Sequence, residues 1–152
     1  MIDKIGIFGP FILLFANLYF LKKIELVYYI LFMAVSSLVN FIVKTITKQP
    51  RPGQPYHSSR FVLKNGLPYD VYGMPSGHAQ SVIFSTVYYY LVMNHGYLLF
   101  FIGISCITLL ERILDEHHSI MQVSVGAILG GLIAVLAVYI KYLNIDLNIN
   151  YM

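Results

Sequence analysis

The stretch SIMQVSVGAILGGLIAVLAVYIKY, residues 119–142, decides which fold this chain can adopt. No charged side chain occurs in it from Ser119 to Ile140. An α-helix needs about 20 mostly apolar residues to cross the hydrocarbon core of a bilayer. The stretch therefore predicts a membrane-spanning helix.

Two glycines four residues apart, Gly126 and Gly130, lie inside this stretch, with Gly131 beside them. Small residues at this spacing let two helices approach closely in lipid. The spacing fits packing inside one bundle and also fits a dimer interface. We favour packing inside the bundle, and the oligomeric state stays open.

Four more apolar stretches approach the same length, at residues 5–21, 25–46, 76–94 and 97–113. The composition agrees, because 58% of the residues are apolar and only 11% are charged, against about 25% charged in an average soluble domain. No small-x-small cleavage site follows the first stretch, so we interpret it as a retained span. The tail from Asn144 to Met152 is polar, and we expect it to fray.

These stretches predict an all-α fold, a transmembrane helical bundle of about five spans, built by a single domain over residues 1–152. The formal charge of +3 comes from scattered basic residues. This excludes the concentrated basic patch of a nucleic-acid binder. We therefore expect an integral, multi-pass membrane protein whose partners are membrane lipids and not nucleic acid.

Five spans bring the N-terminus, the polar segment 48–74 and the charged break 114–118 to one membrane face. Lys44, Glu111 and Arg112 lie at or near the ends of spans on that same face. Ionisable groups near membrane depth are costly and usually mark a functional site. The sequence therefore predicts an active site at this face.

Three cations on this face, Lys44, Arg51 and Arg112, suit a phosphate group. The planar fork of arginine matches phosphate oxygens in pairs, and lysine acts as a point charge. The alternative is that long basic side chains reach for lipid headgroups. We favour that alternative only for basic residues outside this set.

The segment Pro75-Ser76-Gly77-His78 has the residues of a helix start. Proline and serine are common there, and the serine hydroxyl can accept a bond from a free backbone N–H. Such a helix N-terminus is also a site for anions. The segment by itself fits an ordinary capped helix equally well.

His118 and Gln122 are four residues apart and therefore share one face of a helix. A nucleophilic histidine needs its second ring nitrogen held, which fixes the tautomer and the orientation of the ring. The side-chain carbonyl of Gln122 is suited to this task. His117 breaks the Arg112-x5-His118 spacing, and we assign it to the loop.

Together, Lys44-x6-Arg51-Pro52, Pro75-Ser76-Gly77-His78 and Arg112-x5-His118 resemble the three ordered motifs of the type 2 phosphatidic acid phosphatase superfamily, which also contains the vanadium haloperoxidases. The resemblance covers about residues 36–135, which we take as the motif-bearing core. It implies a membrane phosphatase with its site at one end of a helical bundle.

The sequence around two of the motifs is similar to the dolichyldiphosphatase branch of that superfamily. The similar stretches are Asn40 to Pro52 and Gly73 to Gln80. That branch cleaves polyprenyl diphosphate to the monophosphate, with its site facing the lumen of the endoplasmic reticulum. The resemblance implies the same substrate and location for this chain.

The resemblance also implies a reaction in two steps. His118 attacks phosphorus and forms a phosphohistidine, while His78 protonates the leaving oxygen and then activates water. Gln122 orients the nucleophile. The implied phosphate-binding residues are Lys44, Arg51, Ser76, Gly77 and Arg112. We expect no cofactor and no metal.

Two positions depart from the family pattern, because Glu111 replaces a serine and Gln122 replaces an aspartate. Glutamine also occurs at the second position in the dolichyldiphosphatase and glucose-6-phosphatase branches, so it is compatible with activity. On this basis, Gln122→Asp is predicted to keep or raise activity. Glu111 would repel a phosphate, and we expect it to point away or to pair with Arg112.

Other functions remain open on the sequence alone. Phosphatidic acid, undecaprenyl diphosphate or a sugar phosphate are alternative substrates. A different class of function is a degenerate scaffold that binds phosphate-bearing lipids without catalysis, which Glu111 makes worth testing. Tyr56 and Tyr72 are candidates to line the lipid access route, or to be interfacial aromatic residues.

Overall fold

The computed structural model describes residues 2–52, 72–93 and 95–150, and over these ranges it contains helices and no strand. The elements are α1 (Ile2–Phe20), α2 (Lys23–Thr47), α4 (Gly77–Val92), the 3-10 turn η1 (His95–Tyr97), α5 (Leu98–Leu114) and α6 (Ile120–Asn150). The predicted all-α class is therefore confirmed over this part of the chain. Tyr56 lies outside the described residues.

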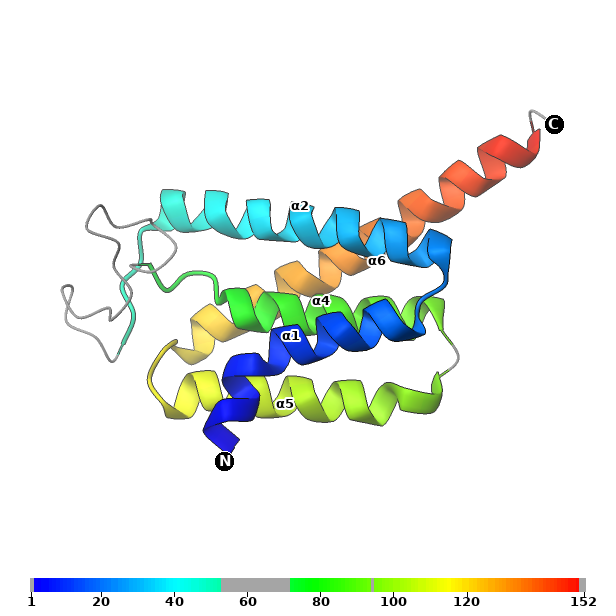
Figure 1. Ribbon diagram of the computed structural model, residues 1–152. Coiled ribbons are helices and arrows are strands. Elements are labelled where there is room, and N and C mark those ends of the chain that lie inside the picture. Colours follow the sequence, from blue (N-terminus) through cyan, green and yellow to red (C-terminus); the bar gives the residue numbers. More distant parts are fainter. Residues whose placement is uncertain (1, 53–71, 94, 151–152) are drawn as a thin grey trace.

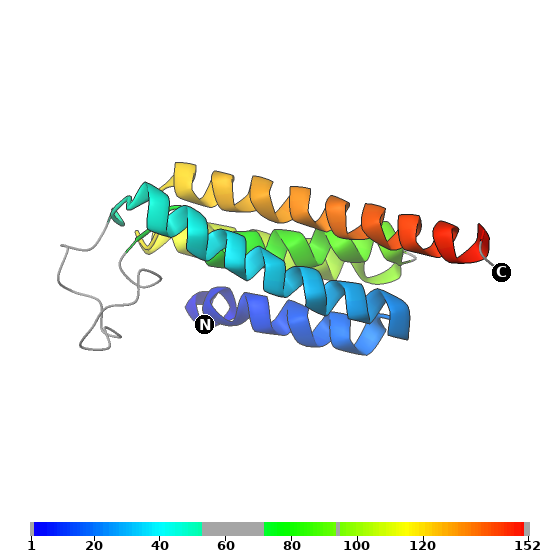
Figure 2. The ribbon, with the colours of Figure 1, turned by 90° about the horizontal axis from the view of Figure 1, so that it is seen from above.

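The helices run alongside one another and reverse direction at each connection (Figures 1 and 2). As a result, α1 begins, α2 ends, α4 begins, α5 ends and α6 begins at the same end of the bundle. We call this the site end, because it carries the three sequence motifs. The C-terminal part of α6 extends beyond the opposite end.

Helix boundaries at the site end follow from local chemistry. The hydroxyl of Ser76 accepts a hydrogen bond from the backbone N–H of Ala79, at 3.4 Å, and thereby caps the start of α4. At the end of α2, Lys48 takes a left-handed backbone conformation, with φ 47°. Its N–H donates to the carbonyl of Lys44 at 3.0 Å, which closes the last turn.

The last helix is longer than the sequence suggested. We expected the chain to fray from Asn144, but α6 continues to Asn150. Neither proline nor glycine occurs between these residues, and these are the residues that most strongly end a helix. Polarity was therefore the wrong criterion for the end of this helix.

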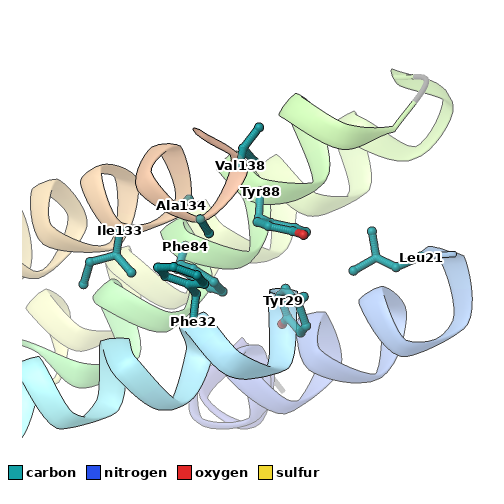
Figure 3. Close-up of a cluster of buried hydrophobic side chains, with 9 residues drawn as sticks. Leu21, Tyr29, Phe32, Phe84, Tyr88, Ile133, Ala134 and Val138 are labelled. Atoms are coloured by element: carbon teal, nitrogen blue, oxygen red, sulfur yellow. The ribbon is translucent and has the colours of Figure 1, made fainter. Parts of the chain in front are cut away.

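The centre of the bundle is α4, which packs against α1, α2, α5 and α6. Phe84 and Tyr88 of α4 lie between α2 and α6, close to Tyr29 and Ala134 (Figure 3). The Tyr29 ring centroid is 5.5 Å from that of each of the two α4 rings. Such close contacts provide the dispersion energy that holds helices together when the surroundings are as apolar as the core.

The paired glycines of α6 face α4. A Cβ on Gly126 would overlap the carbonyl oxygen of Ser76, and a Cβ on Gly130 would overlap that of Gln80. Glycine is therefore required for the two helices to approach this closely. The spacing serves packing inside the bundle, as we predicted, and it places α6 directly against the start of α4.

Candidate active site

Two backbone hydrogen bonds at the site end join segments that carry different motifs, and another closes the loop within the third motif. The N–H of Ser76 donates to the carbonyl of Gln122 at 3.0 Å, and that of Gly73 donates to Gln49 at 2.7 Å. The N–H of His118 donates to the carbonyl of Arg112, also at 3.0 Å. Segments far apart in the sequence are thereby held in one fixed arrangement.

His118 lies in the short connection between α5 and α6, and only 3% of its surface is exposed. Its Nδ1 is 3.2 Å from Oε1 of Gln122. The same Oε1 accepts a hydrogen bond from the backbone N–H of Ser119, so it is the oxygen of the amide. Nδ1 must therefore be the donor, and in the neutral ring the lone pair is left on Nε2.

Two cations act on the His118 ring. Burial, together with the positive charges of Arg51 and Lys44, lowers its pKa from 6.5 to about 3. The hydrogen bonds with Gln122 and with the Gly73 backbone oppose this change but are weaker. His118 is therefore a neutral imidazole at physiological pH, which is the form that can act as a nucleophile.

The phosphate-binding cations occupy the same end. Lys44 is 1% exposed, and its Nζ donates to the carbonyl of Tyr72 at 2.7 Å. Tyr72 thus supplies a backbone contact to the predicted site. Arg51 and Arg112 both lie within electrostatic range of His78. Because Arg51 also acts on His118, the two histidines have one cation in common.

Arg112 is buried and paired with its neighbour Glu111, through two hydrogen bonds to the two carboxylate oxygens. This is the pairing that we expected from the sequence. The Glu111 side chain lies against Gly6 of α1, where a Cβ would lie 2.6 Å from that of Glu111. The absence of a side chain at position 6 provides the room for a carboxylate at a position where the family pattern has a serine.

His78 lies in the first turn of α4, and its Nε2 is 3.2 Å from the carbonyl oxygen of Ile7 in α1. A carbonyl can only accept, so Nε2 carries the hydrogen and Nδ1 remains for proton exchange. Ser76 is fully buried; its N–H bonds to the carbonyl of Gln122, and its hydroxyl caps α4. The phosphate contacts of Ser76 and Gly77 stay predictions.

Sequence analysis missed a buried polar network behind the motifs. Asn40 of α2 donates to Oε1 of Gln80 at 2.7 Å and to the carbonyl of Pro75 at 3.5 Å. Gln80 in turn donates to the carbonyl and hydroxyl oxygens of Ser36. The network fixes α4 against α2. The available signal was a set of amide side chains inside otherwise apolar spans.

A possible metal site lies nearby. Glu111, Asp115 and His117 offer ligand atoms that lie within 4.8 Å of one another. Burial and the charge of Arg112 lower the pKa of His117. Because Glu111 already binds the Arg112 guanidinium, a cation placed here would compete with that ion pair. Independence from metals stays a prediction.

A mostly apolar cavity of about 350 Å³ opens between α1, α2 and α4. Its lining residues are Pro10, Phe11, Leu14, Met33, Ser37, Gly77, His78 and Ser81. His78 and Gly77 are therefore shared by the cavity and by the second motif. The start of α4 therefore forms part of the cavity wall.

The family model described as the PAP2 superfamily matches residues 25–146. This range includes all three motifs, the whole of α4 and α5, and most of α2 and α6. No curated protein and no solved structure matches the chain.

Proposed function

The chain belongs to the PAP2 superfamily, and from this premise we propose that it is an integral membrane phosphatase that hydrolyses a lipid phosphate or diphosphate through a phosphohistidine. The family indicates a phosphatase or phosphoesterase. The observation that carries the mechanism is the geometry at His118. Its Nδ1 is held by Gln122 at 3.2 Å, and Lys44 and Arg51 act on its ring.

In the first step, Nε2 of His118 attacks phosphorus and forms a P–N bond while the P–O bond to the leaving group breaks. His78 gives its Nδ1 proton to the leaving oxygen, and the Ile7 carbonyl holds the opposite nitrogen. Lys44, Arg51 and Arg112 offset the charge on the phosphoryl oxygens. Preorganised charges of this kind are the main contribution of protein to phosphoryl transfer.

In the second step, His78 removes a proton from water, and the resulting hydroxide attacks phosphorus. The P–N bond breaks, and its electron pair returns to Nε2 of His118. The products are inorganic phosphate and a His78 ring that is protonated again for the next cycle. No cofactor is needed for either step, and we propose that no metal takes part.

The apolar cavity supports a lipid as the substrate. It is lined by Phe11 and Leu14 of α1 and by Met33 of α2. His78 also forms part of its wall. A phosphate held by the cations would leave its hydrocarbon tail beside this cavity. Most of the cavity lining is carbon, which suits an acyl or polyprenyl chain better than a sugar.

The outer surface supports a membrane location. Two helices, Lys23–Thr47 and Ile120–Asn144, are long and apolar enough to cross a bilayer, and Ile5–Phe20 is a shorter apolar helix. Large apolar side chains are exposed on the outside of α1, α2, α5 and α6. Contiguous exposed apolar surface of this extent is costly in water. We therefore propose a multi-pass bundle of five spans.

Polyprenyl diphosphate is the substrate that we propose first, because the stretches around Lys44 and His78 are similar to dolichyldiphosphatases. This proposal places the chain in the endoplasmic reticulum with its site towards the lumen. The alternatives are phosphatidic acid and a sugar phosphate. A non-catalytic scaffold is less well supported, because Glu111 contacts Arg112 and α1 and does not figure among the charges acting on His118.

The test is phosphate release by the purified protein in detergent from four substrates: polyprenyl diphosphate, polyprenyl monophosphate, phosphatidic acid and glucose 6-phosphate. We expect the highest kcat/KM with the diphosphate and the same rate after dialysis against EDTA. Release from phosphatidic acid alone would reassign the substrate. Release from none of the four would favour the scaffold, and loss of activity in EDTA would contradict the metal-independent mechanism.

A further inference from the structure

The side-chain amide of Gln122 contacts two motifs at once. Oε1 is 3.2 Å from Nδ1 of His118 and 3.2 Å from the N–H of Ser119. On the other side, Nε2 is 2.8 Å from the carbonyl oxygen of Pro50 and 3.2 Å from Oε1 of Gln49. One buried side chain thus joins the nucleophile to the segment that leads directly into Arg51.

Two backbone groups fix which way this amide points. The Ser119 N–H can only donate, and the Pro50 carbonyl can only accept. Oxygen must therefore face Ser119, and nitrogen must face Pro50. An ionised glutamate carries only acceptors, so it would place an anionic oxygen against the Pro50 carbonyl. An aspartate is one methylene shorter and likewise has no donor for that carbonyl. The orientation of His118 tolerates a carboxylate, whereas the contact with Pro50 requires an amide.

Gly73 provides the space for this amide. A Cβ at position 73 would lie 2.6 Å from Nε2 and 2.7 Å from Cδ of Gln122. The N–H of Gly73 also donates to the carbonyl of Gln49 at 2.7 Å. Gln49 is therefore held from both sides, by the backbone of Gly73 and by the side chain of Gln122.

We propose that Gln49, Gly73 and Gln122 form a positioning unit that sets Arg51 relative to His118. This proposal rests on the proposed phosphatase function. The contacts among Gln49, Gly73 and Gln122 are the same whichever lipid is hydrolysed. Gln49 and Gly73 gain a role that the motifs did not assign to them. Gln122 gains a second role, which is to hold the Arg51 segment through its nitrogen.

This unit changes what we expect from substitutions of Gln122. On the sequence alone, Gln122→Asp was predicted to keep or raise activity. With the contacts to Pro50 and Gln49 in place, removing the amide nitrogen leaves the Pro50 carbonyl without this donor. We therefore expect weaker phosphate binding, even where the carboxylate still orients His118.

The test uses the isosteric variant Gln122→Glu, which keeps the acceptor for His118 and removes the donor to Pro50. The readout is binding of orthovanadate, a mimic of the phosphoryl transition state, to the full chain in detergent by calorimetry. We expect the Kd to rise by up to about 10-fold, which is the upper end of what one lost hydrogen bond costs. A role in orienting His118 alone predicts an unchanged Kd and a kept or raised kcat.

Two further variants keep the proposal testable if Gln122→Glu folds poorly. Gln49→Met removes the acceptor for Gln122 with little change in size, and we expect its Kd for vanadate to rise by about 3-fold with an unchanged pH profile. Gly73→Ala displaces the Gln122 amide and should raise the Kd at least as much as Gln122→Glu. Gly103→Ala is the matched control, because a Cβ there meets nothing within 4 Å.

The outcomes separate this proposal from the proposed function. If all three variants bind vanadate as tightly as the parent, the positioning unit is refuted, whatever the activity. If the parent hydrolyses none of the lipids but the variants weaken vanadate binding as expected, the unit stands and the substrate assignment falls. If the parent binds no vanadate, the site is no phosphate site, and both proposals fall.

Discussion

The two ends of the bundle both bury charge, but they do so differently. At the end opposite the site, Lys141 is 3% exposed. Its Nζ is 3.7 Å from Oε1 of Glu25 and lies over the ring of Tyr142, 4.5 Å from the centroid. One cation therefore meets one carboxylate and one aromatic ring, and the ion pair links α6 to α2.

At the site end, three cations surround two histidines. Among the described residues in this group, Glu111 is the buried carboxylate, and it pairs with Arg112. Lys44 and Arg51 act on a His118 ring that burial keeps neutral. The comparison suggests that charge at one end is balanced by the fold, whereas charge at the other end is arranged to receive an anion.

The sharpest test of this difference is the loss of the nucleophile. We expect His118→Ala to lower kcat by about 10³-fold or more, and to abolish acid-labile labelling of the protein by substrate carrying labelled phosphorus. His117→Ala is the matched control, because the neighbouring ring is half-buried and lies outside the motif spacing. Parent-level phosphate release by His118→Ala would show that another residue is the nucleophile.

The second test compares the two buried lysines directly. Lys44→Met should lower kcat/KM by about 100-fold or more, because one charge that stabilises the transition state is lost. Lys141→Met should keep kcat/KM close to that of the parent but lower the Tm, because Glu25 loses its partner. Both constants and Tm are measured on matched detergent preparations. Equal losses of activity in the two variants would remove the distinction between the ends.

The third test uses pH. Because burial and nearby cations hold the pKa of His118 at about 3 instead of 6.5, the ring stays neutral as the pH falls through 6.5. We expect kcat/KM, corrected for ionisation of the substrate, to show no acid limb from His118 near pH 6.5.

The same shift has a consequence for stability. Below pH 6.5 the unfolded chain binds a proton at His118 that the folded chain does not bind, so this group destabilises the fold progressively from pH 6.5 towards 3. His118→Asn should reduce that part of the pH dependence of Tm. A Tm that falls in the same way in both proteins would mean that His118 is protonated when folded.

The smallest expected effect comes from Glu111. Glu111→Gln keeps an acceptor for Arg112 and the shape beside Gly6, but it removes the negative charge. We expect the affinity for vanadate to rise by about 3-fold, the scale of one partly screened charge. A loss of affinity instead would indicate that the carboxylate is needed to hold Arg112 in place, and titration calorimetry distinguishes the two.

Much of this fold could be predicted from the sequence, because apolar length is a strong signal. The expected stretch 25–46 became Lys23–Thr47, and 97–113 became Leu98–Leu114. The motif residues also stand out in the sequence, since their side chains carry unusual chemistry for an apolar chain, and their roles stay predictions. The sequence predicts five consecutive helices that alternate in direction. This alternation places the motif residues at the same end of the bundle.

The remaining features depend on contacts that no local pattern specifies. The bond between His78 and Ile7 joins residues 71 positions apart and involves a backbone carbonyl, which any residue could supply. The hydrogen bond from Gln122 to Pro50 is also made to the backbone carbonyl of a residue distant in the sequence. Gly73 appeared as a residue next to a motif, and only the position of the Gln122 amide explains why it has no side chain.

The contact between His78 and Ile7 also bears on how the protein is made. Helix α1 is synthesised before α4 and α6 after it, yet α1 supplies the acceptor for His78, and the carbonyl of Gln122 in α6 accepts a hydrogen bond from the Ser76 N–H. The site is therefore incomplete until α6 has emerged from the ribosome and packed against α4. A nascent chain with four helices inserted would hold the cations but would lack the partner that orients His118. Under the proposed function, competence for catalysis would then coincide with the docking of α6 against α4.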